Sequence, residues 1–308
     1  MDLYSPQVIK AIKQKFGFKN SKSLGQNFLT DPDVIRAIIE GAEISESDLV
    51  IEVGPGFGVL TDEAAKHAGK VIAIELDKDL LPVLDFTLAG HTNVEIINED
   101  VLKIDLNNLI EGELGSTPVE HAATEAFGST RSAERGGKLT NVKIIGNLPY
   151  YITTPILMKL LESKVNAESI IVMMQKEVAE RILAEPGGKE YGALTVAVQY
   201  RTITETVAEV PKESFFPAPK VDSQVLKLTL REKPAVKPID EDLFFRMVKA
   251  GFSQRRKTIL NSLSTSGLPK EEIAACLDAV KIDNKRRAET LSLQDFCSIA
   301  DYFSRKRD

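Results

Sequence analysis

Short apolar runs alternate with amphipathic stretches from about residue 48 onward. Five runs are rich in Val, Ile and Leu and have the length of single strands: 49–53, 71–75, 94–97, 142–146 and 169–174. Between the first three runs, residues 60–68 and 78–89 have helical periodicity. Apolar strands that alternate with helices are typical of a parallel sheet covered on both faces. The pattern therefore predicts an α/β fold with five buried parallel strands.

The pattern changes after this alternation. Residues 193–201 are expected to form a helix, whereas residues 204–210 and 223–230 alternate apolar and polar positions. Since no long crossover separates these last two segments, we expect them to form an antiparallel pair that closes one edge of the sheet.

A domain boundary is expected at residues 231–240, which contain two prolines and mixed charge. The sequence thus predicts a large domain over residues 1–232 and a small all-α domain over residues 233–308. Four stretches beyond the boundary have helical patterns: 242–253, 255–263, 269–280 and 292–306. Residues 111–140 are polar and rich in Gly, Ser and Thr, so we expect an exposed insertion there.

The net charge of -6 argues mildly against a nucleic-acid partner, but the basic residues are clustered. The three clusters are Lys10, Lys13, Lys15, Lys19 and Lys22; Arg246, Lys249, Arg255, Arg256 and Lys257; and Lys281, Lys285, Arg286 and Arg287. One such cluster is more often a solvated helix face. Three of them in an acidic chain favour a polyanionic partner.

The remaining composition indicates an ordinary cytoplasmic protein. The two cysteines, Cys276 and Cys297, lie far from the motifs described below, and no metal-ligand spacing is present. No apolar run approaches the roughly 20 residues of a membrane-spanning helix, and the N-terminal residues lack the apolar core of a signal peptide. We expect a cytoplasmic monomer with no metal and no membrane association.

A glycine-rich turn, Gly54-Pro55-Gly56-Phe57-Gly58, follows the first predicted strand. Such a turn lets the backbone approach a ligand closely and presents a helix N-terminus, although a purely structural turn is nearly as good an interpretation. The dinucleotide fingerprint requires a glycine at the position of Val59. The spacing therefore favours a nucleotide-type ligand without a pyrophosphate.

Further candidate ligand contacts surround this turn. Glu75 ends the second strand, where a carboxylate accepts both ribose hydroxyls, or else faces solvent. Asp100, followed by Val101, closes the third strand and is placed either to accept an adenine amino group or to cap a helix. Asn27 and Leu29 precede the first strand and form either a lid over the ligand or an ordinary turn.

The segment Asn147-Leu148-Pro149-Tyr150 directly follows the fourth strand. The amine of adenine is a poor nucleophile because its lone pair is delocalised into the ring. Two acceptors, the Asn147 side chain and a backbone carbonyl near Leu148, would localise that lone pair on the nitrogen. Pro149 would stiffen the turn and Tyr150 would stack on the base. A proline turn that merely caps the strand is the weaker interpretation at this edge of a sheet.

A second aromatic element, Phe215-Phe216-Pro217, lies before the last predicted strand. A flipped base needs both faces covered, and Phe215 would cover the face opposite Tyr150. The competing interpretation, that these rings belong to the core, is expected to hold for one of them. A cytosine C5 methyltransferase is excluded, since its cysteine nucleophile is absent from this region.

Taken together, these motifs resemble those of the ribosomal RNA adenine dimethyltransferase family, most of all its bacterial small-subunit branch. The shared motifs are S-L-G-Q-N-F-L, E-V-G-P-G-x-G-x-L-T, E-x-D, N-E-D, G-N-L-P-Y, residues 174–181, F-F-P-x-P-K-V-D-S and F-S-Q-R-R-K-T. The resemblance spans roughly residues 10–300. It implies a Rossmann-like sheet that binds S-adenosylmethionine, and dimethylation at N6 of two adjacent adenosines in the 3′-terminal hairpin of small-subunit (16S) rRNA, coupled to biogenesis of that subunit.

The resemblance also implies roles for individual residues. Cofactor contacts are expected at Asn27, Leu29, Gly54, Gly56, Glu75, Asp100, Val101 and Asn147. Catalytic residues are expected at Asn147, Leu148, Pro149, Tyr150 and Phe215, with the target base between Tyr150 and Phe215. Contacts with the RNA of the small ribosomal subunit are expected at Lys22, Arg255, Arg256 and Lys257. The chain departs from the family pattern in its acidity and in the length of residues 111–140.

Three other functions remain open at this point. A macrolide-resistance type methyltransferase would perform the same chemistry on large-subunit rRNA, but the F-S-Q-R-R-K-T segment and helical tail favour the small subunit. A DNA adenine methyltransferase would need a sequence-reading domain, which is not recognisable here. A non-catalytic ribosome assembly factor would keep the fold and lose the chemistry, whereas Glu75, Asp100 and Asn147 are all present.

Overall fold

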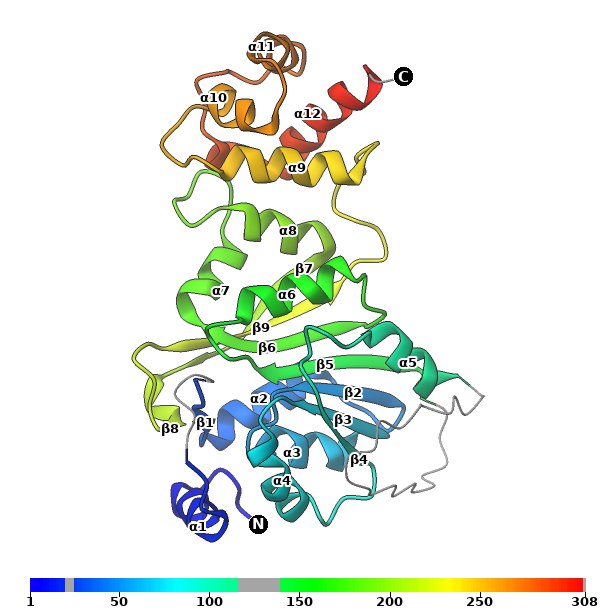
Figure 1. The fold of residues 1–308 in the computed structure, drawn as a ribbon, viewed down its shortest axis with the longest axis vertical. Coiled ribbons are helices and arrows are strands. Elements are labelled where there is room, and N and C mark those ends of the chain that lie inside the picture. The colour runs from blue at the N-terminus through cyan, green and yellow to red at the C-terminus, as the bar shows by residue number, and fades with distance from the viewer. Residues whose placement is uncertain (20–24, 116–138, 307–308) are drawn as a thin grey trace. The chain divides into compact units, whose positions relative to one another are not determined.

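The computed structural model describes residues 1–19, 25–115 and 139–306. Its main feature is a seven-stranded sheet, and Figure 1 shows how the helices are arranged around it. The strand order is β4-β3-β2-β5-β6-β9-β7. The strands are β2 (Asp48–Val53), β3 (Lys70–Glu75), β4 (Val94–Asn98), β5 (Asn141–Asn147), β6 (Ser169–Gln175), β7 (Thr202–Val210) and β9 (Ser223–Leu230). Strands β2 to β6 pair in parallel, β9 is antiparallel to β6, and β7 forms the edge next to β9. The predicted α/β fold and its antiparallel edge are confirmed.

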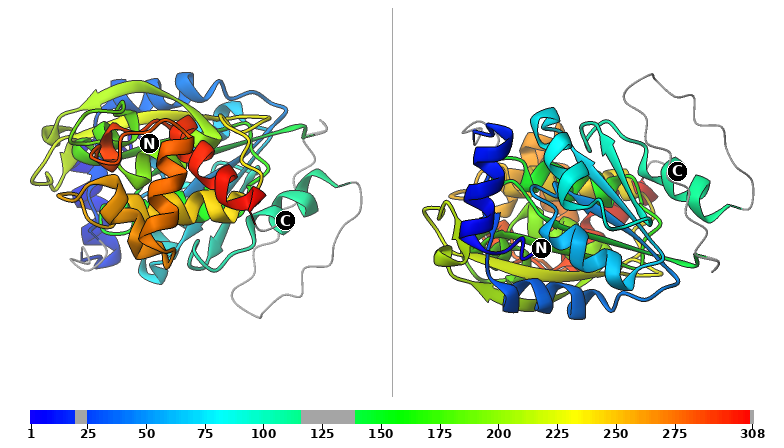
Figure 2. Two further views of the ribbon diagram at one scale, coloured as in Figure 1. Left: turned by 90° about the horizontal axis from the view of Figure 1, so that it is seen from above. Right: turned by 90° about the horizontal axis from the view of Figure 1, so that it is seen from below.

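Helices cover both faces of this sheet. The order of the parallel strands reverses between β2 and β5, so helices before and after the reversal lie on opposite faces. The helices are α1 (Pro6–Phe16), α2 (Pro32–Ala42), α3 (Val59–His67), α4 (Leu81–Thr87), α5 (Leu106–Leu114) and α6 (Thr153–Glu162). Helix α2 packs against α3 and against β5 and β6, and α1 packs against α4 (Figures 1 and 2). A further short sheet pairs β1 (Phe28–Leu29) with β8 (Phe215–Phe216) in antiparallel register.

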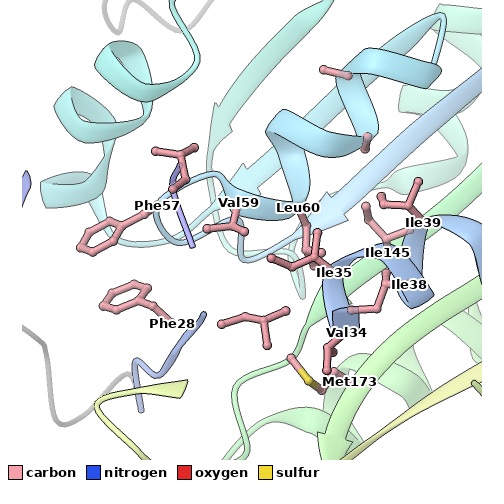
Figure 3. Packing of buried hydrophobic residues seen from close by; sticks show 14 of the residues in the cluster. Phe28, Val34, Ile35, Ile38, Ile39, Phe57, Val59, Leu60, Ile145 and Met173 are labelled. Atoms are coloured by element: carbon pink, nitrogen blue, oxygen red, sulfur yellow. The ribbon is translucent and has the colours of Figure 1, made fainter. Parts of the chain in front are cut away.

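Helix α2 shows how local sequence produces this packing. Asp31 caps its N-terminus by accepting hydrogen bonds from the backbone amides of Asp33 and Val34, and Pro32 occupies the first turn. Its buried face consists of Val34, Ile35, Ile38, Ile39 and Ala42, spaced three and four residues apart. Figure 3 shows this face next to Ile145 of β5 and Met173 of β6, which belong to the same core.

Three sequence expectations need correction. Strand β4 is only partly buried, because it forms an edge of the sheet. Residues 111–114 belong to helix α5 and not to an insertion, while residues 116–138 lie outside the described part of the chain. The helix expected over 255–263 is shorter: α10 is Ile259–Leu263, and residues 255–257 form the turn before it.

By its internal contacts the chain divides into two compact units, residues 1–176 with 205–230 and residues 177–204 with 231–308. The second unit consists of α7 (Lys176–Leu183, apart from its first residue), α8 (Ala193–Arg201), α9 (Glu241–Phe252), α10, α11 (Lys270–Ala279) and α12 (Leu293–Arg305). Residues 177–204 group with it because Tyr191, Val196 and Tyr200 share its core. The division of roles between residues 1–232 and 233–308 stays a prediction. Within the described residues no helix is long and apolar enough to cross a membrane.

Candidate active site

A pocket opens where the parallel strands end, at the point where the strand order reverses. It lies within the first compact unit, and its main lining segments are residues 25–29, 52–57, 74–76, 99–101 and 147–152. The reversal separates the helices that follow β2 and β5, which leaves room for a ligand at the carboxyl ends of these strands. All of the predicted cofactor contacts line this pocket: Asn27, Leu29, Gly54, Gly56, Glu75, Asp100, Val101 and Asn147.

The glycine-rich turn has a backbone that only glycine adopts easily. Gly54, Gly56 and Gly58 have φ angles of 73°, 60° and 83°. The amide of Gly54 donates to the carbonyl of Ile74 at 3.0 Å, which ties the turn to the neighbouring strand. A Cβ atom on Gly56 would lie 3.2 Å from the ring of Phe28. The turn therefore requires glycine for its conformation and, at Gly56, also for its packing.

Glu75 is a buried carboxyl group in the wall of the pocket, with a relative exposure of 6%. Burial raises its pKa to about 7, and hydrogen bonds from the backbone amides of Asp77 and Gly56 oppose this rise. The Asp77 amide donates to Oε1 at 2.7 Å. A carboxylate accepts more hydrogen bonds than these, so Glu75 can also accept from ligand hydroxyls.

Glu52 is a second buried carboxyl group in the pocket lining. Its Oε2 accepts a hydrogen bond of 2.6 Å from the Thr61 hydroxyl. Burial, and to a smaller extent the nearby charge of Glu75, raise its pKa to about 8, against the effect of that hydrogen bond. Glu52 is therefore largely neutral at pH 7.

Asp100 takes part in a local turn in addition to lining the pocket. Its Oδ1 accepts a hydrogen bond of 3.0 Å from the Leu102 amide within a turn. The helix that follows, α5, is capped by Asp105, so the interpretation of Asp100 as a helix cap is wrong. Because a carboxylate has two oxygens and several lone pairs, this bond leaves acceptor capacity for a ligand amino group. The interpretation of Asp100 as an acceptor for an adenine amino group stays a prediction.

Asn147 ends β5, and its side chain is held by the segment of residues 25–29, which is called the lid below. Its Nδ2 donates to the backbone carbonyl of Asn27 at 3.1 Å, and Asn27 Nδ2 donates in turn to the carbonyl of Gly25 at 3.0 Å. Since the nitrogen of the Asn147 amide is engaged as a donor, Oδ1 is the acceptor that remains for a substrate. The orientation of this amide is therefore set by residues far away in the sequence.

The residues after Asn147 are fixed by the sheet and by helix α6. Leu148 is buried, and its amide donates to the Met173 carbonyl at 3.1 Å. The carbonyl of Pro149 accepts from the Thr153 hydroxyl at 3.0 Å. Tyr150 is half-buried, and its hydroxyl shares a hydrogen bond of 2.6 Å with Ser223 Oγ. The Tyr150 ring is thus held in the pocket wall.

Phe215 does not join this arrangement. It is 4% exposed, belongs to the hydrophobic core and is absent from the pocket lining, because β8 pairs it with Leu29. The structure does not place it opposite Tyr150. Phe216 is partly buried, with the ammonium groups of Lys10 and Lys13 at 5.4 and 5.9 Å from its ring centre.

The predicted RNA contacts lie elsewhere. Arg255, Arg256 and Lys257 are exposed in the turn before α10, in the second compact unit. The guanidinium of Arg255 donates to the carbonyl of Lys189 at 2.6 Å, which anchors this turn. Lys22 lies outside the described residues. In the described part of the chain, no group of three or more His, Cys, Asp or Glu residues is arranged to hold a metal.

Sequence reasoning missed two features of the pocket. Phe28 and Phe57 stack on each other, and the amide of Gln26 donates to Asp77 Oδ2 at 2.6 Å. The stack joins the lid to the turn after β2, and the Gln26 hydrogen bond joins it to the residues after β3. The only available signal was the position of Phe28 and Phe57 within the two glycine-containing motifs.

Comparison with known proteins assigns the chain to a family. The model of a family described as ribosomal RNA adenine dimethylase matches residues 17–305. The chain belongs to this family. It is 47% identical to proteins named ribosomal RNA small subunit methyltransferase A from Alkaliphilus oremlandii (98% of both chains covered) and from Clostridioides difficile (99% of this chain and 98% of the other).

Two solved structures extend the comparison. A dimethyladenosine transferase from Plasmodium falciparum has a TM-score of 0.70 and 26% identity, covering 91% of this chain and 98% of the other. The 23S rRNA methyltransferase ErmE has a TM-score of 0.63 and 26% identity, covering 90% and 100%. The similarity to both is nearly full-length, so the helical second unit is included in the shared fold.

Proposed function

We propose that this chain is an S-adenosylmethionine-dependent methyltransferase that dimethylates N6 of two adjacent adenosines in the 3′-terminal hairpin of 16S rRNA. The observation that carries the proposal is the fixed amide of Asn147, which presents Oδ1 as an acceptor at the end of β5 beside a nucleotide-type pocket. Membership of the ribosomal RNA adenine dimethylase family supports the same chemistry. The names of the relatives that are 47% identical support the small subunit as substrate.

The residues of the pocket fit the cofactor. The buried carboxyl of Glu75 suits a ribose diol, Asp100 has acceptor capacity for an adenine amino group, and the glycine-rich turn lets the backbone approach closely. Bound there, S-adenosylmethionine supplies an electrophilic methyl group on a sulfonium. This methyl group is all that the cofactor contributes to the reaction.

The chain's own residues prepare the adenine amine. Asn147 Oδ1 and the backbone carbonyl of Leu148 accept hydrogen bonds from its two N–H groups, since the Pro149 carbonyl is already engaged with Thr153. These bonds favour a nitrogen with a localised lone pair. The groups are positioned before the reaction, so orientation and electrostatics provide the acceleration. The proton leaves after methyl transfer, and no strong base is required.

Tyr150 supplies a stacking surface for the target base. Its hydroxyl is engaged with Ser223, which fixes the ring at the pocket wall and leaves the ring face as the functional part. Phe215 would have to leave the core to cover the opposite face. Tyr150 is therefore the stacking residue of this proposal.

The second compact unit docks on the ribosomal particle through its exposed basic turn, Arg255, Arg256 and Lys257. The chain acts in the cytoplasm as a monomer during small-subunit biogenesis. Its substrate is the RNA of the small subunit, and the phosphates of that RNA pair with this turn.

A transfer assay with three acceptors tests the proposed substrate. Unmethylated small subunits, large subunits and duplex DNA are each incubated with labelled S-adenosylmethionine and the protein. The proposal predicts label in small-subunit RNA alone. Label in large-subunit RNA would instead indicate the function of the ErmE-type relatives, and label in DNA would overturn the RNA assignment. Cofactor binding without any transfer would favour a non-catalytic assembly factor.

A further inference from the structure

Two aromatic rings join the lid to the glycine-rich turn. The rings of Phe28 and Phe57 stack with centres 4.0 Å apart and planes at 9° (Figure 3). Both side chains are buried, with 6% and 1% relative exposure. Phe18 packs edge-on against both rings, at 5.5 Å from Phe57 and 6.3 Å from Phe28. The stack is therefore part of the buried core.

The two rings come from two different segments that line the same pocket. Phe57 lies between Gly56 and Gly58 in the turn, whereas Phe28 directly follows Asn27. The Phe28 ring also packs close to the turn, and a Cβ on Gly56 would approach it to 3.2 Å. A side chain at position 56 would therefore crowd the ring.

The backbone of Phe28 is fixed on its other side. It pairs with Phe216 in the short β1–β8 sheet, and the next residue but one, Thr30, donates to the Ser214 carbonyl at 2.8 Å. Phe28 therefore has its ring packed on the turn and its backbone in the lid. That backbone includes the Asn27 carbonyl, which holds the amide of Asn147.

We infer that the Phe28–Phe57 stack couples occupancy of the cofactor pocket to the orientation of Asn147. The contacts run from Glu75 to the Gly56 amide, then to the Phe28 ring, the Asn27 carbonyl and the Asn147 side chain. Phe28 is thus a positioning residue that acts through Asn147. The kinetic tests of this inference rest on the proposed function, whereas the hydrogen-exchange test with S-adenosylhomocysteine does not.

The coupling makes a kinetic prediction. Phe28→Leu keeps an apolar side chain of similar size and removes the stack. It should lower kcat for small-subunit RNA about 10- to 100-fold, since small displacements of a positioning group cost this much. The KM values for RNA and cofactor should change less than about 3-fold. Phe57→Leu removes the other ring of the stack and should give the same result, which covers the case that one variant fails to fold.

Phe18→Leu is the matched control. It removes a buried ring that packs edge-on against the stack, while both stacked rings and residues 25–29 keep their own side chains. It should leave kcat within about 3-fold while lowering thermal stability about as much as Phe28→Leu does. An equal kcat loss in Phe18→Leu, or an unchanged kcat in both Phe28→Leu and Phe57→Leu, would overturn the coupling.

A double-mutant cycle distinguishes action through Asn147 from general loosening. Groups that act as a unit have strongly non-additive effects. In an Asn147→Ala background, Phe28→Leu should lower the single-turnover rate no further. A second full 10- to 100-fold loss would show that Phe28 acts independently of Asn147.

Hydrogen exchange gives a test that needs no RNA substrate. Binding of S-adenosylhomocysteine should protect backbone amides of both the turn, residues 54–58, and the lid, residues 25–29. In Phe28→Leu the turn should remain protected, whereas protection of the lid should be lost. Equal protection of the lid in both proteins would overturn the inference even if the wild-type protein methylated another RNA.

Discussion

The side-chain nitrogen of Asn147 and the backbone oxygen of Asn27 lie 3.1 Å apart and form a hydrogen bond. This bond joins the end of a central strand to the lid, and it decides which end of the Asn147 amide faces a substrate. An amide that was free to rotate could also present its NH2 group to the substrate amine. The bond therefore converts an ordinary asparagine into a fixed acceptor.

Asn147→Ala should remove methyl transfer while keeping the fold and cofactor binding. Loss of one pre-positioned hydrogen-bonding group at a reacting centre typically lowers kcat about 10²- to 10³-fold. Single-turnover transfer to small subunits measures this rate, and calorimetry with S-adenosylhomocysteine measures binding. Asn141→Ala, at the other end of β5, is the control and should retain the wild-type rate. Near wild-type transfer by Asn147→Ala would refute the role of this side chain.

Tyr150 should act through its ring and not through its hydroxyl. Tyr150→Phe loses only the hydrogen bond to Ser223, so transfer should stay within about 5-fold of wild type. Tyr150→Ala loses the stacking surface, which is worth about 1–3 kcal/mol per base, and should raise the KM for RNA or lower kcat about 5- to 150-fold. Steady-state kinetics of the two variants separate these effects. Equal losses would mean that the hydroxyl is the functional group.

Cofactor affinity should depend on the ionisation of Glu75. Burial places its pKa at about 7, and ribose hydroxyls donate hydrogen bonds to the carboxylate form. Binding thus requires loss of a proton below pH 7, so the association constant should fall by up to about tenfold per pH unit there and level off above it. Calorimetry between pH 5.5 and 8.5 in buffers of different ionisation enthalpy also detects the released proton.

Two variants control this measurement. Glu75→Gln should bind more weakly at pH 8 and lose the dependence on pH, whereas Glu46→Gln, on an exposed side chain, should behave as wild type. A wild-type affinity that is constant from pH 5.5 to 8.5 would show that Glu75 does not change ionisation on binding.

Glu52 should make the folded protein less stable at alkaline pH. Its pKa is about 8 in the fold and 4.5 when exposed, so the folded state binds more protons than the unfolded state between these values. The free energy of unfolding contributed by this group therefore falls as the pH rises from about 4.5 to about 8. Glu52→Gln stays neutral and keeps an acceptor for Thr61, so urea denaturation should show a smaller stability loss between pH 6 and 9 in this variant. A parallel pH dependence in both proteins would refute the raised pKa.

The basic turn should contribute to the salt dependence of RNA binding. Arg256→Ala combined with Lys257→Ala should weaken binding to small subunits and reduce the slope of log K against log salt by nearly 2, if each side chain neutralises one phosphate. The double variant Lys233→Ala, Lys237→Ala removes two exposed lysines from the same compact unit and should leave the slope unchanged. Filter binding at several salt concentrations measures both, and equal slopes for the two double variants would remove the turn from the RNA interface.

The sequence was sufficient to predict the sheet, because its central strands are nearly uninterrupted apolar runs such as 49–53 and 169–174. The sequence was also sufficient to predict which residues line the pocket, since residues at the carboxyl ends of parallel strands meet at one edge of the sheet. Helix α2 was missed, although Asp31-Pro32 and the spacing of its isoleucines are ordinary helix signals.

Features that depend on pairing between distant segments could not be predicted. The burial of Phe215 follows from the register of β8 with β1, and two-residue strands leave no periodicity in the sequence. The stack of Phe28 on Phe57 depends on the same register. The raised pKa values of Glu52 and Glu75 depend on how completely the fold excludes water from both groups.

In the proposed function, adenine N6 is methylated twice at a site built around Asn147. The most direct test of this proposal is to identify the product: small-subunit RNA labelled by the wild-type protein is digested to nucleosides, which are separated and assigned by mass. We expect N6,N6-dimethyladenosine to carry nearly all of the label, with two such nucleosides per subunit at completion. Label in a methylated cytidine, or on a ribose hydroxyl, would contradict the proposal.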